Sequence, residues 1–161
     1  MGEVKKLFLM LAAVAAFILV VGLISKNKLQ IRTSNSNLKT IKVGVSQVSV
    51  TVADTDETRK KGLGGVTNLP NNQGMLFVFD KKTATPSFWM KGMLIPLDMI
   101  WIKEGRITQI DANIPNPTPG TLDSQLKIYS PGEPVDYVLE VNAGFSEKNN
   151  IKVGDMVTFS L

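Results

Sequence analysis

The stretch LDMIWIKEGRITQI, residues 97–110, decides the fold class of this chain. Its first six residues are apolar except for one aspartate, and they include the isoleucine and tryptophan that are enriched in strands. The polar sequence Lys103-Glu104-Gly105-Arg106 follows, and its glycine tolerates a tight turn. Another segment with strand-like composition comes next. The stretch therefore predicts two strands joined by a turn.

Other segments predict further strands. In residues 41–54, IKVGVSQVSVTVAD, apolar residues alternate with others, but the phase of the alternation shifts by one after Val45. A bulge or tight turn at Ser46-Gln47 would keep each face consistently buried. Three more strand-like segments are GMLFVF (74–79), YVLEV (137–141) and MVTFSL (156–161). Glu140, in the second of these segments, is expected to point outward from its strand.

Two short helices are expected between the strands. The sequence Asp54-Thr55-Asp56-Glu57 has the form of a capping box, with Asp54 accepting from the first turn and Glu57 reaching back. AGFSEKNN (143–150) offers one or two further helical turns, and the three prolines of NIPNPTPGTLD (113–123) predict a surface loop. The fold class is therefore mainly β: a compact β sandwich or partly open barrel with one or two short helices.

The N-terminal part of the sequence has a different composition. Residues 7–24, LFLMLAAVAAFILVVGLI, carry no charge. As a helix at about 1.5 Å per residue they would span roughly 27 Å, close to the hydrocarbon thickness of a bilayer. We therefore expect a short basic N-terminus (1–6), a single transmembrane helix that acts as a signal anchor (7–24), a flexible polar linker (25–40) and an extracytoplasmic β domain (41–161).

A cleaved signal peptide is the competing interpretation of the same segment. The apolar run is longer than the roughly 7–15 residues of a signal core, and early small-x-small triplets such as Ala13-Val14-Ala15 lie inside the run instead of after it. These two features favour an uncleaved anchor.

The positive charge is concentrated near the N-terminus. The net charge is +4, but residues 1–40 hold six basic residues and one acidic residue, whereas residues 41–161 hold 12 basic and 13 acidic residues. The predicted domain is therefore close to neutral, and its composition does not indicate nucleic-acid binding. Histidine and cysteine are absent from the sequence, which excludes thiol nucleophiles, disulfides, imidazole bases and His or Cys metal ligands. No metal and no cofactor is expected.

Five blocks of the sequence, in order, closely resemble the domain of unknown function 192 (DUF192) family over roughly residues 48–159. The blocks are ETRKKGLGG (57–65), GMLFVFD (74–80), PSFWMKGMLIPLDMIWI (86–102), IYSPGEPVDYVLEVNAG (128–144) and IKVGDMV (151–157). The resemblance implies a compact, mainly β prokaryotic domain, often behind a signal or membrane anchor, and implies no established reaction. Many relatives carry two cysteines where this chain has NPTPGTLDSQLKIY (116–129), so no metal or disulfide role carries over to that loop.

Two charged residues stand out within the apolar segment 88–102, namely Lys91 and Asp98. Gly92 and Pro96 lie between them, so a turn or bulge could bring the two side chains together. The structural interpretation is a buried ion pair, or two side chains that each bind loop backbone. The functional interpretation is a charged pair at the base of a pocket.

Aromatic residues near this charged pair complete the candidate site. Indole combines a large apolar face with a polar N–H, so a tryptophan can hold a sugar ring or a peptide, although it more often fills a core. The candidate ligand-binding residues are Trp89, Lys91, Asp98, Trp101 and Tyr129.

Catalytic arrangements have weaker support. Ser87 and Lys91 are the local candidates for a serine–lysine dyad, but nothing marks a strained turn or a neutral lysine. Arg59, Lys60 and Lys61 on the first predicted helix are typical of a solvated face. Glycoside hydrolysis needs a pair of carboxylates, which could be drawn from Asp98, Asp111, Glu140 and Asp155. Their spacing in the sequence does not single out any one pair.

The sequence therefore favours binding over catalysis. We expect a single-pass protein of the cell membrane whose extracytoplasmic domain binds an unknown ligand, either a cell-envelope component such as a glycan or a membrane-protein partner. The alternatives are an envelope enzyme that acts on glycans with carboxylates, and a purely structural assembly module.

Overall fold

The computed structural model describes Gly2, residues 38–79 and residues 84–160. The predicted transmembrane helix (7–24) and most of the predicted linker lie outside the described residues. Within the described part of the chain, no helix is both long enough and apolar enough to cross a membrane. The folded domain lies within the unit Ser36–Leu161.

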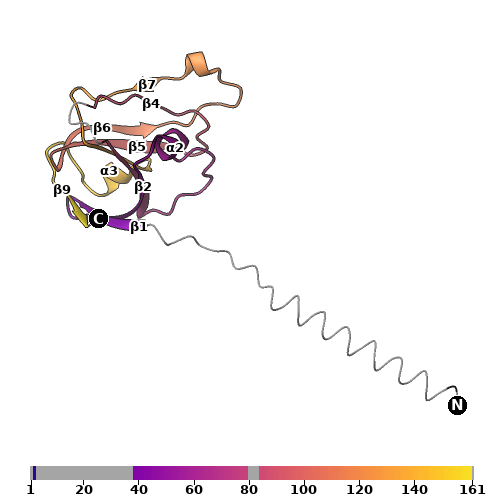
Figure 1. Ribbon diagram of the computed structural model, residues 1–161, viewed down its shortest axis with the longest axis horizontal. Helices are drawn as coiled ribbons and strands as arrows, with labels where there is room; N and C mark the ends of the chain where they lie inside the picture. Colours follow the sequence, from indigo (N-terminus) through magenta and orange to yellow (C-terminus); the bar gives the residue numbers. More distant parts are fainter. Residues whose placement is uncertain (1, 3–37, 80–83, 161) are drawn as a thin grey trace. The chain divides into compact units, whose positions relative to one another are not determined.

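A mixed seven-stranded sheet forms the body of the domain (Figure 1). Its strand order is β6-β5-β8-β3-β2-β1-β9, and all neighbours are antiparallel except β2 and β3, which a helix connects. The strands are β1 (Leu38–Val43), β2 (Ser46–Ala53), β3 (Gln73–Val78), β5 (Leu97–Lys103), β6 (Arg106–Ile114), β8 (Tyr137–Asn142) and β9 (Val157–Ser160).

Three short helical segments and a separate two-stranded ribbon accompany the sheet. The helical segments are α2 (Asp56–Lys61), the 3-10 turn η1 (Asp123–Gln125) and α3 (Phe145–Lys148), and the ribbon is made of β4 (Phe88–Trp89) and β7 (Ile128–Tyr129). The mainly β prediction is confirmed.

The sheet curls until its two edge strands meet at one end. Arg106, at the start of β6, forms an isolated bridge with Met156, next to β9. The Val157 backbone N–H donates to the Gly105 carbonyl at 2.8 Å, and the Gly154 N–H donates to the Ile107 carbonyl at 2.8 Å. The sheet is thus a half-barrel, and of the two architectures that the sequence allowed, the partly open barrel is the one that describes it.

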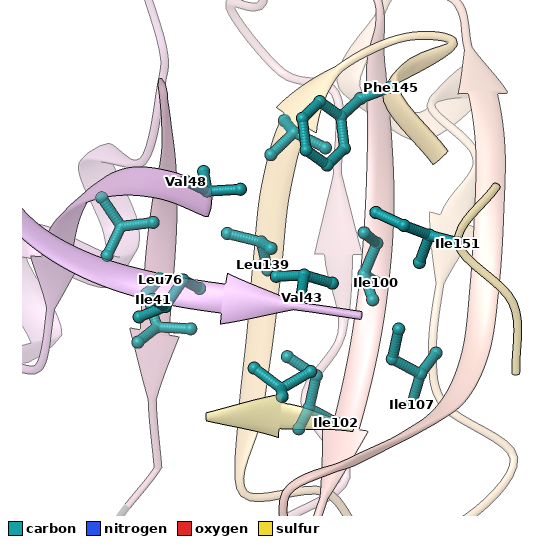
Figure 2. Close-up of a cluster of buried hydrophobic side chains, with 13 residues drawn as sticks. Ile41, Val43, Val48, Leu76, Ile100, Ile102, Ile107, Leu139, Phe145 and Ile151 are labelled. Atoms are coloured by element: carbon teal, nitrogen blue, oxygen red, sulfur yellow. The ribbon is translucent and has the colours of Figure 1, made fainter. Parts of the chain in front are cut away.

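The concave side of the half-barrel holds the first hydrophobic core. Buried side chains from all seven strands of the sheet contribute to this interior, and Phe145 and Ile151 come from α3 and the segment after it (Figure 2). Its largest fully buried strand residues are Ile41, Leu76, Ile100, Ile102, Ile107 and Leu139.

The opposite side of the same sheet carries a second core. Val138 pairs with Phe77 on one side and Trp101 on the other, so these three side chains form a row on this face. Met90 and Tyr129, from the β4–β7 ribbon and its surroundings, are buried in the same cluster. The ribbon therefore covers this face of the sheet (Figure 1), and β5, between two cores, is buried along nearly its whole length.

Two local predictions need correction. The turn between the first two strands is at Gly44-Val45, not at Ser46-Gln47. Gly44 has a φ of 56°, which glycine adopts readily. Val45 lies in the turn and is exposed, so it does not take part in the alternation.

The cap of α2 is the second correction. Thr55, and not Asp54, is the N-cap residue: its extended backbone ends the preceding segment, and its hydroxyl accepts from the Thr58 backbone N–H at 3.2 Å. The reciprocal bond runs from the Thr55 N–H to the Thr58 hydroxyl at 3.0 Å, so Thr58 takes the place expected of Glu57.

Candidate functional site

A cavity of about 310 Å³ lies on the second face of the sheet, between α2 with the glycine turn after it, β3, β8 and the segment that contains β4. Its volume is at the lower end of the range for small-molecule sites. The most deeply buried residues of its lining include Leu63, Phe77 and Glu140. Trp89 and the lysines of the lining are exposed, so they mark the mouth of the cavity.

Glu140 is the main unexplained polar group of this cavity. It lies on β8 directly between Met75 of β3 and Met99 of β5. The residue is 4% exposed, and its Oε2 atom has no hydrogen-bond partner among the described residues. The prediction that Glu140 points outward is wrong, because β8 is a central strand and both of its faces are covered.

Burial determines the protonation state of Glu140. Removal from water raises the pKa of its carboxyl to about 8, because the charged form loses its hydration. At neutral pH and with the cavity empty, the group is therefore mostly a neutral carboxylic acid, which can both donate and accept hydrogen bonds. A cation placed beside it would favour the ionised form.

Aromatic rings form much of the cavity wall. Phe88 packs edge-on against Phe77, with ring centroids 4.9 Å apart, and edge-on against Phe79 at 6.4 Å. Phe88 also contacts the buried Trp101 edge-on at 5.6 Å. These mutual contacts fix the wall before any ligand arrives, because edge-on aromatic pairs are favourable in themselves.

Cations surround the mouth of the cavity. Arg59 is held in place: its guanidinium donates to the Asp54 carbonyl at 2.7 Å and to the Val78 carbonyl at 2.8 Å, and it lies 5.8 Å from the Phe79 ring centroid. Lys60 and Lys61 follow Arg59 at the end of α2 and are exposed, as predicted for this helix face. They also line the cavity.

Lys91 is a fourth cation of the lining, together with Arg59, Lys60 and Lys61. Its ammonium lies 5.6 Å from the Trp89 ring centroid and forms a half-exposed ion pair with Asp123. Two of the sequence-predicted site residues, Trp89 and Lys91, are thus together at the cavity mouth.

Asp98 has a different role and a different place. It is fully buried on the other face of the sheet, where it lies opposite Val141. Its carboxylate accepts from the backbone N–H groups of Asn113 (2.8 Å), Gly144 (3.0 Å) and Ser146 (2.8 Å). The predicted ion pair between Lys91 and Asp98 is therefore wrong. The alternative interpretation, in which Asp98 binds loop backbone, agrees with these hydrogen bonds.

Trp101 and Tyr129 lie outside this cavity. The fully buried Trp101 indole donates from Nε1 to an Asp111 carboxylate oxygen at 2.7 Å. Tyr129 lines another hollow, under the proline-containing loop, with the Lys127 ammonium 4.6 Å from its ring centroid. Burial, with a smaller contribution from Asp111, raises the pKa of the Tyr129 hydroxyl. The five residues that the sequence grouped into one candidate site thus lie in separate places in the fold.

No group of three or more acidic side chains that could hold a metal ion occurs in the part of the chain that the structure describes. Glu140 is the one carboxylate among the described residues of the cavity lining. The arrangement can therefore bind a ligand through one buried acid, an aromatic wall and a basic mouth.

The fold and its cavity define a small half-barrel domain in which one buried acidic group, Glu140, lies among the described residues of the cavity lining. The chain belongs to the DUF192 family, described as an uncharacterized ACR, whose model matches residues 38–159. This confirms the family that the sequence blocks suggested.

Two solved structures resemble the domain closely. One is a protein from Sinorhizobium meliloti called a "putative transcription regulator", with 28% sequence identity and a TM-score of 0.67 over 76% of this chain and 94% of that one. The other is a protein of unknown function from Novosphingobium aromaticivorans, with 28% identity and a TM-score of 0.64 over 75% of this chain and 83% of that one. No curated protein matches the sequence.

Proposed function

We propose that this protein is a membrane-anchored, extracytoplasmic binding module whose DUF192 domain holds a small ligand of the cell envelope in the Glu140 cavity. The observation that carries the proposal is the buried Glu140 carboxyl in the lining of a preformed cavity, whose Oε2 atom has no hydrogen-bond partner among the described residues. An isolated polar group of this kind costs stability. Its retention is expected where a ligand completes its hydrogen bonds.

The cavity lining indicates what kind of ligand fits. Aromatic walls favour an apolar or ring-shaped body, and the basic mouth favours an acidic group at the outer end. The volume limits the bound part to a small molecule or to one end of a larger one. The domain itself carries 12 basic and 13 acidic residues after position 40, which supports a small acidic ligand over nucleic acid as the partner.

The membrane location is a separate part of the proposal. The uncharged run 7–24 and the lysines before it support an N-terminal anchor with the domain outside. Protease added to intact cells is expected to digest residues 38–160, and digestion only after the membrane is opened would contradict the orientation.

Binding can be tested with small aromatic probes on the full chain in detergent micelles. We suggest 4-(2-aminoethyl)benzoate, 4-propylbenzoate and phenethylamine, with two-dimensional NMR of the backbone amides as the measurement. At least one probe is expected to shift the amides of Gly64, Phe77 and Trp89 in a saturable manner.

A blocking variant provides the control for this binding test. Ser87 is exposed and lines the cavity, so Ser87→Trp would fill its mouth and is expected to abolish the shifts. Ser124→Trp, an exposed position outside the cavity lining, is expected to leave them unchanged. If no probe shifts the cavity amides, or if Ser87→Trp leaves the shifts intact, the proposed function is contradicted.

An enzyme that acts on glycans with two carboxylates, the alternative from the sequence, would need a second acid facing Glu140, and the described residues of the lining do not supply one. The lining therefore supports binding over catalysis.

A further inference from the structure

We propose that the Glu140 cavity selects amines: the ammonium of the ligand binds the Glu140 carboxylate inside, and an acidic group of the same ligand binds the cations at the mouth. The ligand class is a small zwitterion with an apolar or aromatic body. This inference rests on the proposed function, because it specifies the ligand of the same site.

The distribution of charge across the cavity carries the first step. Among the described residues of the lining, the charged groups other than Glu140 are the cations Arg59, Lys60, Lys61 and Lys91. The neighbouring strands place uncharged Met75 and Met99 beside Glu140. A ligand with only positive charge would meet repulsion at the mouth, and one with only negative charge would leave the buried acid without a partner. A zwitterion satisfies both ends.

The partners of the cations decide which of them remain available. Arg59 is bound to two backbone carbonyls and to Asp56, and Lys91 is paired with Asp123, both at partly exposed positions. Lys60 and Lys61 have no described ion-pair partner and are exposed. The acidic end of the ligand is therefore expected to bind mainly at the end of α2.

Burial of Glu140 carries the second step, because a carboxylate and an ammonium attract each other more strongly where the dielectric constant is low than they do in water. Binding of the ammonium is then coupled to the loss of the Glu140 proton. The neutral carboxylic acid of the free protein gives its proton to solvent, the resulting carboxylate pairs with the ligand ammonium, and no bond other than the O–H bond is broken. The raised pKa of Glu140, about 8, means that close to one proton per ligand is released at pH 7.

The experiment is isothermal titration calorimetry of the full chain in detergent micelles, repeated in buffers of different ionisation enthalpy. The three probes form a matched set: 4-propylbenzoate replaces the ammonium of 4-(2-aminoethyl)benzoate by a methyl group, and phenethylamine lacks its carboxylate. At pH 7 we expect 4-(2-aminoethyl)benzoate, the zwitterion, to bind at least tenfold more tightly than either of the other two probes, with release of close to one proton. Its affinity should fall about tenfold per pH unit below 8, because only the ionised carboxylate binds.

Two variants complete the experiment. Glu140→Gln should remove the preference for the zwitterion over 4-propylbenzoate, the proton release and the pH dependence, while 4-propylbenzoate still shifts the cavity amides. Lys60→Met with Lys61→Met should weaken the zwitterion severalfold and leave phenethylamine unchanged or tighter.

The inference is overturned, and the proposed function survives, if 4-propylbenzoate binds the cavity as tightly as the zwitterion or if Glu140→Gln keeps the preference for the amine. Absence of cavity shifts with every probe overturns both the inference and the proposed function.

Discussion

The Asp98 carboxylate of β5 accepts a hydrogen bond from the Ser146 backbone N–H at 2.8 Å, across 48 positions of sequence. Ser146 lies in α3, and Gly144 at the N-cap of α3 donates to the same carboxylate. Asn113, near the end of β6, donates the third bond. One buried side chain thus joins a central strand, an edge strand and a helix, and it holds α3 over the first core.

Asp98→Ala is expected to destabilise the domain by roughly 3–5 kcal/mol, because three backbone N–H groups would lose their acceptor in a buried place. Urea unfolding of the full chain in micelles, followed by tryptophan fluorescence, measures this loss. Lys91→Met is the matched control and should change the unfolding free energy by less than about 1 kcal/mol, since its ion pair is exposed. Equal losses in the two variants would contradict this assignment.

The combination Lys91→Met with Asp98→Ala tests whether the two charges interact. Their side chains have separate partners on separate faces of the sheet, so their effects on the unfolding free energy should add within about 0.5 kcal/mol. A double variant that recovers several kcal/mol would show a coupled pair and would refute the geometry described for them.

The stability of the protein should depend on pH through Glu140. The folded-state pKa is about 8 and the ordinary value is 4.5. Between these two values the unfolded chain has released a proton that the folded chain still holds, so the unfolding free energy falls as pH rises. The penalty is absent below pH 4.5 and complete above pH 8, where it reaches about 5 kcal/mol.

Glu140→Gln removes this titration and should therefore be more stable than the wild type at pH 8.5. At pH 4.5 the two should be similar. Thermal unfolding across this pH range is the measurement, and a difference between wild type and Glu140→Gln that does not grow with pH would rule out the raised pKa.

Gly74 makes the close contact between β3 and β8 possible beside the cavity. A Cβ atom at this position would lie 2.5 Å from the Glu140 carbonyl oxygen and 2.9 Å from a Val141 methyl group. Gly74→Ala is therefore expected to cost about 2–3 kcal/mol of unfolding free energy, because the two strands must move apart.

Gly132→Ala is the control for this effect of close packing. A Cβ atom there meets only the end of the Gln109 side chain, at 3.7 Å. Its effect should stay within about 0.5 kcal/mol. Parallel chemical denaturation of the two variants compares them, and similar losses in both would indicate that close packing at Gly74 is not the cause.

Much of the fold could be predicted from local pattern. The β5–β6 turn lies at Glu104-Gly105, within the predicted segment, and the strands near residues 74–79, 137–141 and 156–161 differ from the prediction by two residues at most at their ends. Apolar runs, glycines and prolines act over a few residues, so the sequence records them directly. The curl of the sheet and the covering of its second face depend on contacts between distant segments.

The site was harder to predict for the same reason. Lys91 and Asp98 lie close together in the sequence, but the fold separates their side chains. Lys91 pairs with Asp123, whereas Asp98 binds backbone N–H groups that include the one of Ser146. Glu140 was expected to face solvent, although its strand YVLEV has apolar residues on both sides of it, which is typical of a strand buried on both faces. That pattern was the available signal for a buried acid.

The state of the buried acid is measured most directly by an NMR titration of the Glu140 side-chain carboxyl carbon in the full chain, from pH 4 to pH 10, with Glu140→Gln to assign the signal. We expect a midpoint near 8, and a shift of the midpoint to lower pH when 4-(2-aminoethyl)benzoate is present. A midpoint near 4.5 in the free protein would show that the carboxyl is hydrated or already paired, and this cavity would then not hold a buried acid in need of a partner.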